Sequence, residues 1–383
     1  MYSGIENWIL KRCGLASFQD LEDWQQDQLA RQTDYAKRSL FYRNGLRGFT
    51  TSDDLRSNPL QFLCIPPKEV SRITTLPTSG TSGVSKRVFF SEEDLQLTVE
   101  YFHVGMQELM APQQKAAIFM PGATPGSVGD LLIQAIEGFG GEAAAYGFIR
   151  NPYDAQIQAA DADCLLGHPI QLLTLSRIAP HLRPKSVLLT GDPVPAWLIT
   201  EMEQTWSCRI HPHYGLTESG FGLAVRGKDG YGEQICHPFI RLDIMDPQTG
   251  TLVPDGEWGE IVLSTLMRQA MPLLHYRTGD CGRWLPDTYP KRLDIRQSRI
   301  QQPQLERNFT IHHLDQAVFS IKDVFYYTAT LKKEGLLLTI DSPAEYHDIS
   351  VALKNVLHLS IPWHIEKKKM LCEPGKRKIA IEE

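Results

Sequence analysis

The sequence predicts an α/β fold with a large N-terminal domain, built on a mainly parallel sheet plus a β subdomain, and a small α+β C-terminal domain. Three observations carry this prediction. Between about residues 73 and 290 short apolar runs alternate with helical stretches, the later runs come in hairpin-like pairs, and beyond about residue 293 the pattern changes again. We therefore predict two domains, residues 1–293 and 294–383.

The individual elements follow from periodicity. Apolar residues recur at helical spacing through DLEDWQQDQLARQTDYAKRSLFYRNGL, which predicts amphipathic helices within residues 1–72. Apolar runs at 116–120, 142–148, 163–167 and 186–191, separated by stretches such as SEEDLQLTVEYFHVGMQELM, predict strands joined by crossover helices. The runs at 241–246 and 259–266 predict hairpin strands. In the C-terminal domain we predict a helix at 314–324, a strand at 336–341 and a second helix at 345–357.

Composition excludes several functional classes. The chain has 383 residues, 42% of them hydrophobic and 22% charged, and a formal net charge of -6, so nothing favours a nucleic-acid or acidic-membrane partner. Seven cysteines without a CxxC pair indicate reduced thiols. The first residues lack a signal-peptide pattern, and no run reaches the roughly 20 apolar residues of a membrane span. We expect a cytoplasmic protein.

The sharpest motif is a hydroxyl- and glycine-rich segment that ends in a lysine. Glycines let the backbone approach phosphates closely, and hydroxyls and amides donate to phosphoryl oxygens. The segment does not fit the GxxxxGK[ST] pattern of ATPases and GTPases. Taken alone, it favours a serine-rich surface loop. Its residues are Thr78, Ser79, Gly80, Thr81, Ser82, Gly83, Val84, Ser85 and Lys86.

Three further motifs are individually weak. The run Tyr214-Gly215-Leu216-Thr217-Glu218 is typical of a helix start. The run YRTGD ends in Asp280, a carboxylate suited to accepting from ribose hydroxyls, although an isolated aspartate here favours a β-turn. Gly375-Lys376 by itself indicates a solvated surface charge.

Together and in this order, the four motifs resemble the adenylate-forming superfamily of acyl-CoA synthetases, nonribosomal adenylation domains and firefly luciferase. The short segment before the first motif resembles the compact branch that contains phenylacetate–CoA ligases, the acyl-protein synthetase of bacterial bioluminescence and the adenylating proteins of phenazine pathways. This resemblance implies an enzyme that joins a carboxylic acid to AMP, releases pyrophosphate and passes the acyl group to a thiol.

The resemblance also implies roles for individual residues. Residues 1–293 would be the adenylation domain that binds ATP and the acid, and 294–383 a mobile lid that turns about Asp294. Residues 78–83 and Lys86 would hold the β- and γ-phosphates, Thr217 the α-phosphate, and Glu218 the Mg²⁺ ion. Lys376 would bridge the reacting groups. The remaining nucleotide contacts would be Gly191, Asp192, Tyr214, Gly215, Leu216, Asp280 and Arg292.

The acid and the acceptor stay open. The loop with Gly122, Thr124 and Pro125 follows a predicted strand, and Phe221 follows Glu218, so both are candidates for the acid site, against a turn-rich loop and a core aromatic as alternatives. An aromatic or medium-chain acid fits the analogy. The acceptor would be CoA, a carrier-protein thiol, a protein cysteine or a partner reductase. Lys291 stands where the family's hinge motif has glycine, which leaves the second half-reaction open. A binding protein that keeps acyl-adenylate without turnover is a further alternative.

Overall fold

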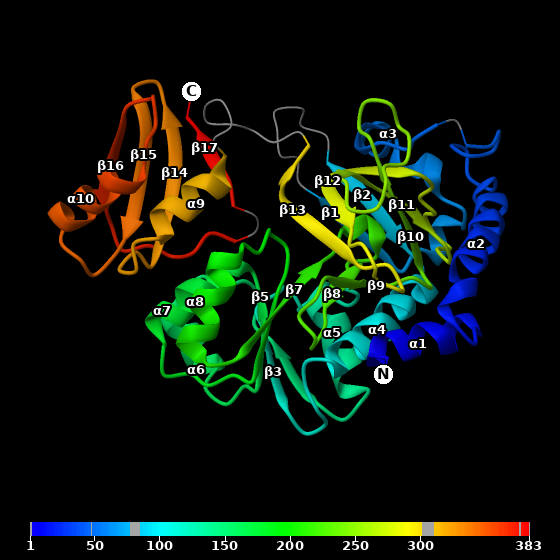
Figure 1. Ribbon diagram of the computed structural model, residues 1–383, viewed down its shortest axis with the longest axis horizontal. Coiled ribbons are helices and arrows are strands. Elements are labelled where there is room, and N and C mark those ends of the chain that lie inside the picture. The colour runs from blue at the N-terminus through cyan, green and yellow to red at the C-terminus, as the bar shows by residue number, and fades with distance from the viewer. Residues whose placement is uncertain (1, 47, 77–84, 301–309, 375–376, 383) are drawn as a thin grey trace. The chain divides into compact units, whose positions relative to one another are not determined.

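The computed structural model describes residues 2–46, 48–76, 85–300, 310–374 and 377–382 (Figure 1). The chain forms two compact units, each assembled from separate stretches of sequence. Unit 1 contains residues 1–114, 121–145 and 211–300, and unit 2 contains residues 115–120, 146–210 and 301–383.

Unit 1 combines helices from the N-terminal stretch with an antiparallel sheet. Its α-helices are α1 (Gly4–Cys13), α2 (Leu21–Ala36), α3 (Ser52–Ser57), α4 (Glu92–Gln107) and α5 (Val128–Glu137). Its strands are β1 (Arg72–Leu76), β2 (Lys86–Phe90), β4 (Glu142–Ala145), β7 (Arg209–Tyr214), β8 (Ala224–Arg226), β9 (Glu233–Ile235), β10 (Ile240–Met245), β11 (Gly259–Thr265), β12 (Tyr276–Trp284) and β13 (Leu293–Arg299). The predicted helices before residue 72 and the predicted β10–β11 hairpin are confirmed.

The antiparallel sheet of unit 1 has the strand order β10-β11-β12-β13-β9-β8-β7. Strand β11 is buried at every position, and Ile261, Val262 and Leu263 form its apolar centre. Strands β1 and β2 form a separate antiparallel pair. Lys86 is the first residue of β2 and Tyr276 is the first residue of β12. Their side chains are in hydrogen-bond contact, so the two strands contribute to one site.

Helix α4 begins with a capping box that its sequence specifies. The Ser91 side chain accepts from the Asp94 amide, and the Asp94 carboxylate accepts from the Ser91 amide. Glu92 and Glu93 lie in the first turn, where their negative charges interact favourably with the positive end of the helix dipole. Leu95, Thr98, Tyr101, Phe102 and Met106 then turn one face of the helix into the core.

Buried histidines make the stability of unit 1 depend on pH, and His237 is one of them. His237 is 6% exposed; its Nε2 lies 3.2 Å from the Lys291 carbonyl oxygen, and its Nδ1 faces the Gln25 amide nitrogen. Burial lowers the pKa of His237 to about 4. In the unfolded chain this histidine takes up a proton near pH 6.5, whereas in the folded chain it stays neutral down to about pH 4. The free energy of unfolding therefore decreases as the pH falls from about 6.5 toward 4.

We expect wild-type protein to lose about 2 kcal/mol of unfolding free energy through His237 between pH 7 and pH 5. His237→Gln should flatten that part of the pH dependence. Urea unfolding midpoints at the two pH values measure it, with His103→Gln at a half-buried position of α4 as control. If the midpoint of His237→Gln falls as steeply as that of the wild type, His237 is not the source.

Unit 2 contains a parallel α/β layer and a second sheet. The first part consists of β3 (Lys115–Ile118), α6 (Pro152–Gln158), β5 (Cys164–Gly167), α7 (Pro169–Ile178), β6 (Ser186–Leu189) and α8 (Ala196–Trp206). The second consists of α9 (Ile311–Phe319), β14 (Tyr326–Lys332), β15 (Gly335–Asp341), α10 (Tyr346–Val356), β16 (Trp363–Lys367) and β17 (Ile379–Ile381). β3, β5 and β6 pair in parallel, as their crossover helices predict.

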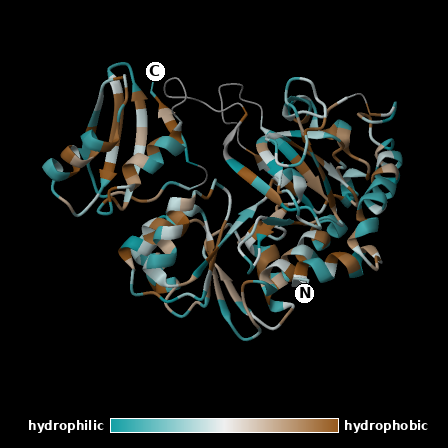
Figure 2. Ribbon diagram, in the orientation of Figure 1, coloured by the Kyte–Doolittle hydropathy of each residue, from teal (hydrophilic) through white to brown (hydrophobic). Residues whose placement is uncertain are grey.

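The second sheet has the order β16-β15-β14-β17, and all its strands lie within residues 294–383. Hydrophobic residues, brown in Figure 2, recur along β14 and β15. They join α9 and α10 in a core that also takes in α7 and α8. Its members include Leu172, Leu198, Trp206, Leu314, Phe319, Tyr327, Leu338, Ile340 and Leu353. The predicted α/β class, with a small α+β C-terminal part, is confirmed.

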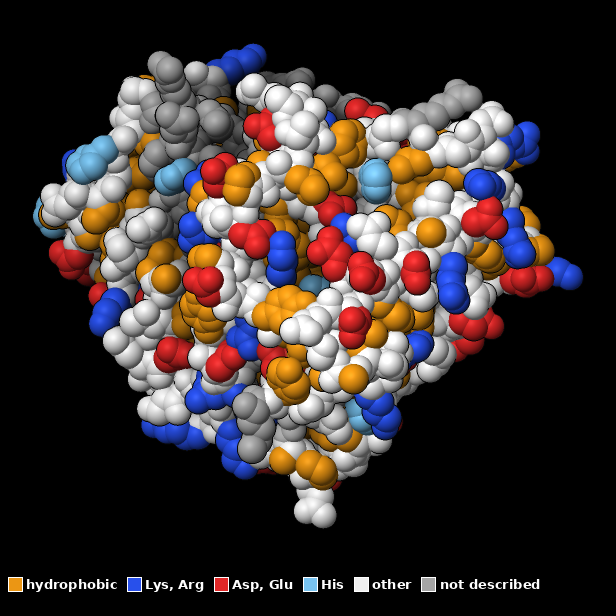
Figure 3. All heavy atoms as spheres, turned by 45° about the vertical axis from the view of Figure 1, so that its right-hand side comes forward, with side chains coloured by type: hydrophobic (Ala, Val, Ile, Leu, Met, Phe, Trp, Pro, Cys, Tyr) orange, Lys and Arg blue, Asp and Glu red, His pale blue; other side chains and the backbone are white. Residues whose placement is uncertain are grey.

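The surface agrees with the mixed charge of the sequence. On the face that Figure 3 draws, basic and acidic side chains of the described residues are interspersed.

Among the described helices, none combines the length and the apolar character that crossing a bilayer requires.

Candidate active site

Three motifs that are distant in the sequence meet at one carboxylate in unit 1. Lys86 donates through Nζ to Oε1 of Glu218, 132 positions further along the chain. The hydroxyl of Tyr276 donates to the same oxygen over 2.9 Å and accepts from Lys86 over 3.2 Å. Glu218 is only 5% exposed, so this closed network is largely shielded from water.

The network fixes the charge of Glu218. Burial alone would raise the pKa of this carboxyl group, but the Lys86 ammonium and the hydrogen bonds from Lys86 and Tyr276 outweigh burial and hold the pKa below its ordinary value. Glu218 is therefore an anion at neutral pH. A buried, oriented carboxylate beside a lysine suits a site that handles a hard cation and phosphate oxygens.

A second pair of side chains joins β7 and β12 of the same unit, which are not neighbours in its sheet. Tyr214, the last residue of β7, donates through its hydroxyl to Oδ2 of Asp280 over 2.8 Å. Asp280 lies within β12, at the point where the register with β13 shifts between Asp280 and Gly282. The YRTGD motif is thus strand rather than the turn that the isolated motif favours, and the bulge gives Asp280 its local orientation.

The YGLTE segment turns tightly on itself. A side chain at Gly215 would place its Cβ 1.7 Å from the carbonyl oxygen of Phe221, so only glycine fits. The amide of Phe221 donates to the carbonyl of Leu216 over 2.9 Å. Thr217 and Glu218 begin the short 3-10 turn η4 (Thr217–Ser219) between these contacts. The turn holds both residues at the end of β7.

The residues predicted to bind the acid come from two loops of unit 1. Gly122, Thr124 and Pro125 lie in the loop that leads into α5, and Thr124 and Pro125 are exposed. Phe221 stacks on Phe90 at the end of β2, with ring centroids 5.3 Å apart. The aromatic candidate is therefore tied to the strand that begins with Lys86.

Arg292 does not lie beside Asp280. Its guanidinium donates to Glu6 of α1 over 2.8 Å and also to Asp229 and the Tyr231 carbonyl. These contacts tie the N-terminal helix to the start of β13 and to the connection between β8 and β9. From its place just before β13, Arg292 lies roughly 20 Å along the strand direction from the position opposite Asp280.

The position opposite Asp280 is occupied by Arg299, the last residue of β13. The sequence analysis did not single out Arg299, because the KRLD run drew attention to Arg292. Only the strand register, which a single sequence does not supply, shows that Arg299 pairs with Asp280. Asp294, the predicted hinge, lies inside β13 opposite Arg283 and accepts from its guanidinium over 2.9 Å.

Two predicted nucleotide contacts lie in unit 2. Gly191 and Asp192 follow β6, and the Asp192 carboxylate lies 3.6 Å from Nδ1 of His168 and accepts from the Arg377 amide over 3.1 Å. Arg377 directly follows Lys376 in the sequence. The remaining predictions lie outside the described residues: Thr78, Ser79, Gly80, Thr81, Ser82, Gly83 and Lys376.

Comparison with known proteins assigns the sequence to a family. The family described as "AMP-binding enzyme" matches residues 20–268. Among curated proteins, phenylacetate-coenzyme A ligase of Pseudomonas putida is 29% identical over 269 residues, covering 63% of this chain and 57% of the relative. The corresponding ligase of Escherichia coli (strain K12) is 25% identical over 326 residues, covering 79% of this chain and 73% of the relative. The chain thus spans little more than half the length of the first of these relatives.

Solved structures show the same fold. A crystal structure of 2-hydroxyisobutyryl-CoA ligase in the postadenylation state, in complex with R3-HIB-AMP, superposes with a TM-score of 0.75 at 16% identity, covering 94% of this chain and 89% of that one. The resemblance drawn from the four motifs is confirmed. With more than half of its sequence matched, the chain belongs to the AMP-binding enzyme family.

Proposed function

We propose that the chain couples a carboxylic acid to AMP with release of pyrophosphate and then transfers the acyl group to a thiol such as CoA. The network of Lys86, Glu218 and Tyr276 carries this proposal, because it joins one residue from each of three nucleotide-associated motifs. Family membership supports it. The phenylacetate ligases among the relatives support CoA as the acceptor.

The first half-reaction brings two anions together. A carboxylate oxygen attacks the α-phosphorus of ATP, the bond to the β-phosphate oxygen breaks, and pyrophosphate leaves. The site must therefore supply cations and donors where negative charge gathers. Lys86 supplies one such cation, Thr217 a hydroxyl donor to the α-phosphate, and residues 78–83 of the hydroxyl-rich segment the remaining phosphate donors.

Glu218 fits a magnesium ion held jointly with phosphates. Mg²⁺ is usually bound by one or two carboxylates together with substrate phosphate oxygens. Within the described residues no group of three or more His, Cys, Asp and Glu side chains is arranged to hold a metal by itself, which agrees with such shared coordination. When bound, Mg²⁺ neutralises phosphate charge. Lys86 and Tyr276 hold the carboxylate ready for this role.

Asp280 is proposed to bind the ribose, with Tyr214 orienting its carboxylate. An ionised carboxylate accepts hydrogen bonds from both ribose hydroxyls. Arg299, rather than Arg292, is proposed as the arginine of this subsite on the backbone register alone, which pairs Arg299 with Asp280. The contacts of Arg292 with Glu6 and Asp229 support a structural role instead.

Asp280→Ala is expected to raise the KM for ATP by about 100-fold or more, because two hydrogen bonds to a charged group are lost. The KM for the acid should change little. Initial rates of pyrophosphate exchange at varied ATP measure this, with Asp255→Ala in an exposed turn as the matched carboxylate control. An unchanged KM for ATP would count against the ribose assignment.

The acid is proposed to be aromatic or medium-chain. Phe221, stacked on Phe90, would supply an aromatic face for it, and the loop with Gly122, Thr124 and Pro125 is proposed to line the same site. In the second half-reaction, the part of the chain that follows β13 is proposed to turn as a lid, withdrawing Lys376 and admitting the thiol. Asp294 itself lies within β13 of unit 1. The amide of Arg377 donates to Asp192, which belongs to the segment proposed to line the adenine pocket.

ATP–pyrophosphate exchange across a panel of carboxylic acids tests the proposal. Acid-dependent exchange is expected for at least one aromatic or medium-chain acid, followed by thioester formation when CoA is added. Exchange without CoA transfer would point to a carrier-protein thiol, a protein cysteine or a partner reductase as acceptor. Retention of acyl-adenylate without exchange would indicate a binding protein.

A further inference from the structure

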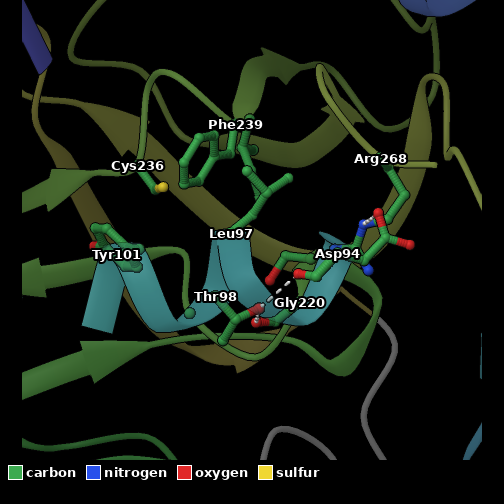
Figure 4. Close-up of a pocket in the computed structure, with 11 residues that line it drawn as sticks. Asp94, Leu97, Thr98, Tyr101, Gly220, Cys236, Phe239 and Arg268 are labelled. Atoms are coloured by element: carbon green, nitrogen blue, oxygen red, sulfur yellow. Dashed lines mark hydrogen bonds and ion pairs between the residues drawn. The ribbon is translucent and has the colours of Figure 1, made fainter. Parts of the chain in front are cut away.

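A small cavity lies beneath the YGLTE turn, entirely within unit 1 (Figure 4). It measures about 20 Å³, which is room for about one water molecule. Figure 4 shows Arg268 and Asp94 together at one end, and Tyr101 and Cys236 toward the other. Arg268 is only 6% exposed, and among the described residues its Nη1 has no hydrogen-bond partner. A guanidinium buried this deeply is costly and calls for a reason.

The ion pair with Asp94 does not account for the burial of Arg268. Nε of Arg268 lies 4.0 Å from Oδ1 of Asp94, at the outer limit of an ion pair. Asp94 is already satisfied by backbone amides, since it accepts from Gln269 over 2.7 Å and from Ala270 over 2.9 Å, as well as from Ser91 in the capping box. The carboxylate is therefore well solvated by the backbone without the arginine.

The other contacts of Arg268 lead to the turn. Its guanidinium lies over the ring of Phe90, 4.8 Å from the centroid, and the Phe90 ring stacks on Phe221 at an interplanar angle of 18°. A Cβ at Gly220 would lie 2.6 Å from Nη2 of Arg268. Thr98 donates to the Gly220 carbonyl over 2.9 Å from the side of α4. Arg268 and α4 thus hold both residues that follow η4.

The turn needs this support because its backbone is unusual. Gly220 has φ +92° and Phe221, which carries a side chain, has φ 73°. A residue with a side chain in this region costs of order 1–3 kcal/mol and persists only where the surroundings impose it. The stacked rings and guanidinium of Arg268, Phe90 and Phe221 restrain it here, beside the hydrogen bond from the Phe221 amide to the Leu216 carbonyl.

We infer that Arg268 is a positioning residue that sets the place of Phe221, and through it the fit of the acid. The inference rests on the proposed function, in which Phe221 lines the acid site. Arg268 itself touches no reacting atom. It acts through the flat face it presents to Phe90, which a lysine does not reproduce.

Arg268→Lys keeps the positive charge near Asp94 and removes the flat guanidinium. We expect the KM for the acid to rise about tenfold, the equivalent of one buried cation–π contact, while the KM for ATP stays within twofold. Phe90→Leu should have a similar effect. Because both changes interrupt the same contact, the double variant should be no worse than either single one.

Arg12→Lys is the matched control. Arg12 also pairs with a carboxylate, Glu100, and lies over an aromatic ring, Phe239, on another wall of the same cavity, but it has no contact with the turn among those described. Its kinetics should equal those of the wild type. An unchanged KM for the acid in Arg268→Lys, an equal rise for ATP and acid, or additive effects in the double variant would overturn the inference.

Hydrogen–deuterium exchange separates this inference from the proposed function. In Arg268→Lys, amides of residues 216–222 should exchange at least about fivefold faster, while those of β10 and β11 stay unchanged. If the wild type activates no acid, the proposed function fails, and the exchange result alone decides the positioning role. Equal exchange rates of 216–222 in the two proteins would overturn it.

Discussion

Lys376→Ala is expected to lower acid-dependent ATP–pyrophosphate exchange by roughly 10²–10³-fold, because one charge-stabilising donor in an acyl-transfer site is worth about 2.7–4 kcal/mol. The attacking carboxylate and the α-phosphate repel each other, and Lys376 is proposed to neutralise both in the transition state. The measurement is the rate of exchange at saturating ATP and acid.

The contacts of the neighbouring residue, Arg377, should not be affected by the substitution of Lys376. The guanidinium of Arg377 donates to Asp315 over 2.8 Å and to the Tyr327 carbonyl over 2.9 Å, and it is buried in unit 2. Its backbone amide donates to Asp192. Because these contacts belong to Arg377, removing the Lys376 side chain leaves them in place.

Two comparisons isolate the role of Lys376. Lys378→Ala removes an exposed lysine from the same segment and should leave exchange unchanged. Transfer from ready-made acyl-adenylate to the thiol should proceed in Lys376→Ala at close to the wild-type rate, since the lysine is needed only in the first half-reaction. Equal loss in both half-reactions would refute its placement on a lid that withdraws.

Much of the fold could be predicted because local sequence specifies it. The apolar runs at 116–120, 163–167 and 186–191 are strands of a parallel layer, as expected for strands that are joined by crossover helices. Ser91 and the acidic residues after it mark the start of α4. These signals lie within a few residues of the element that they predict, so no tertiary information was needed.

The nucleotide motifs were also recognisable, but the sequence could not say which of their side chains meet. Tyr276 is the first residue of YRTGD, yet its role as a partner of Glu218 depends on how β12 lies relative to β2. The choice between Arg292 and Arg299 depends on strand register and on a bulge, since one misplaced residue changes every partner along the strand.

The contacts that Arg268 makes below the YGLTE turn could not be predicted for a further reason. Arg268, Phe90 and Phe221 come from three elements, and none belongs to a pattern that predicts a buried arginine. A guanidinium in a core is rare, and periodicity assigns it to the surface. Contacts between distant residues of this kind become visible only when the chain is folded.

Glu218→Gln is expected to depress exchange by about 100-fold and to raise the Mg²⁺ concentration for half-maximal activity by about tenfold or more. The pKa of Glu218 is held below its ordinary value by Lys86 and Tyr276, against the effect of burial, so the wild-type group is an anion across the working pH range. Glutamine keeps the shape and removes the charge. The loss should therefore be independent of pH between about 6 and 8.

A buried charge lost from any site carries a cost of its own, and Glu233→Gln measures that cost. Glu233 is 4% exposed and accepts from Arg226 over 2.6 Å, so it is a buried carboxylate paired with a cation in the same unit as Glu218 but at β9. Both variants should lose stability, whereas only Glu218→Gln should shift the magnesium requirement. An unaltered metal dependence in Glu218→Gln would mean that the carboxylate serves Lys86 alone, as a structural partner in the phosphate site.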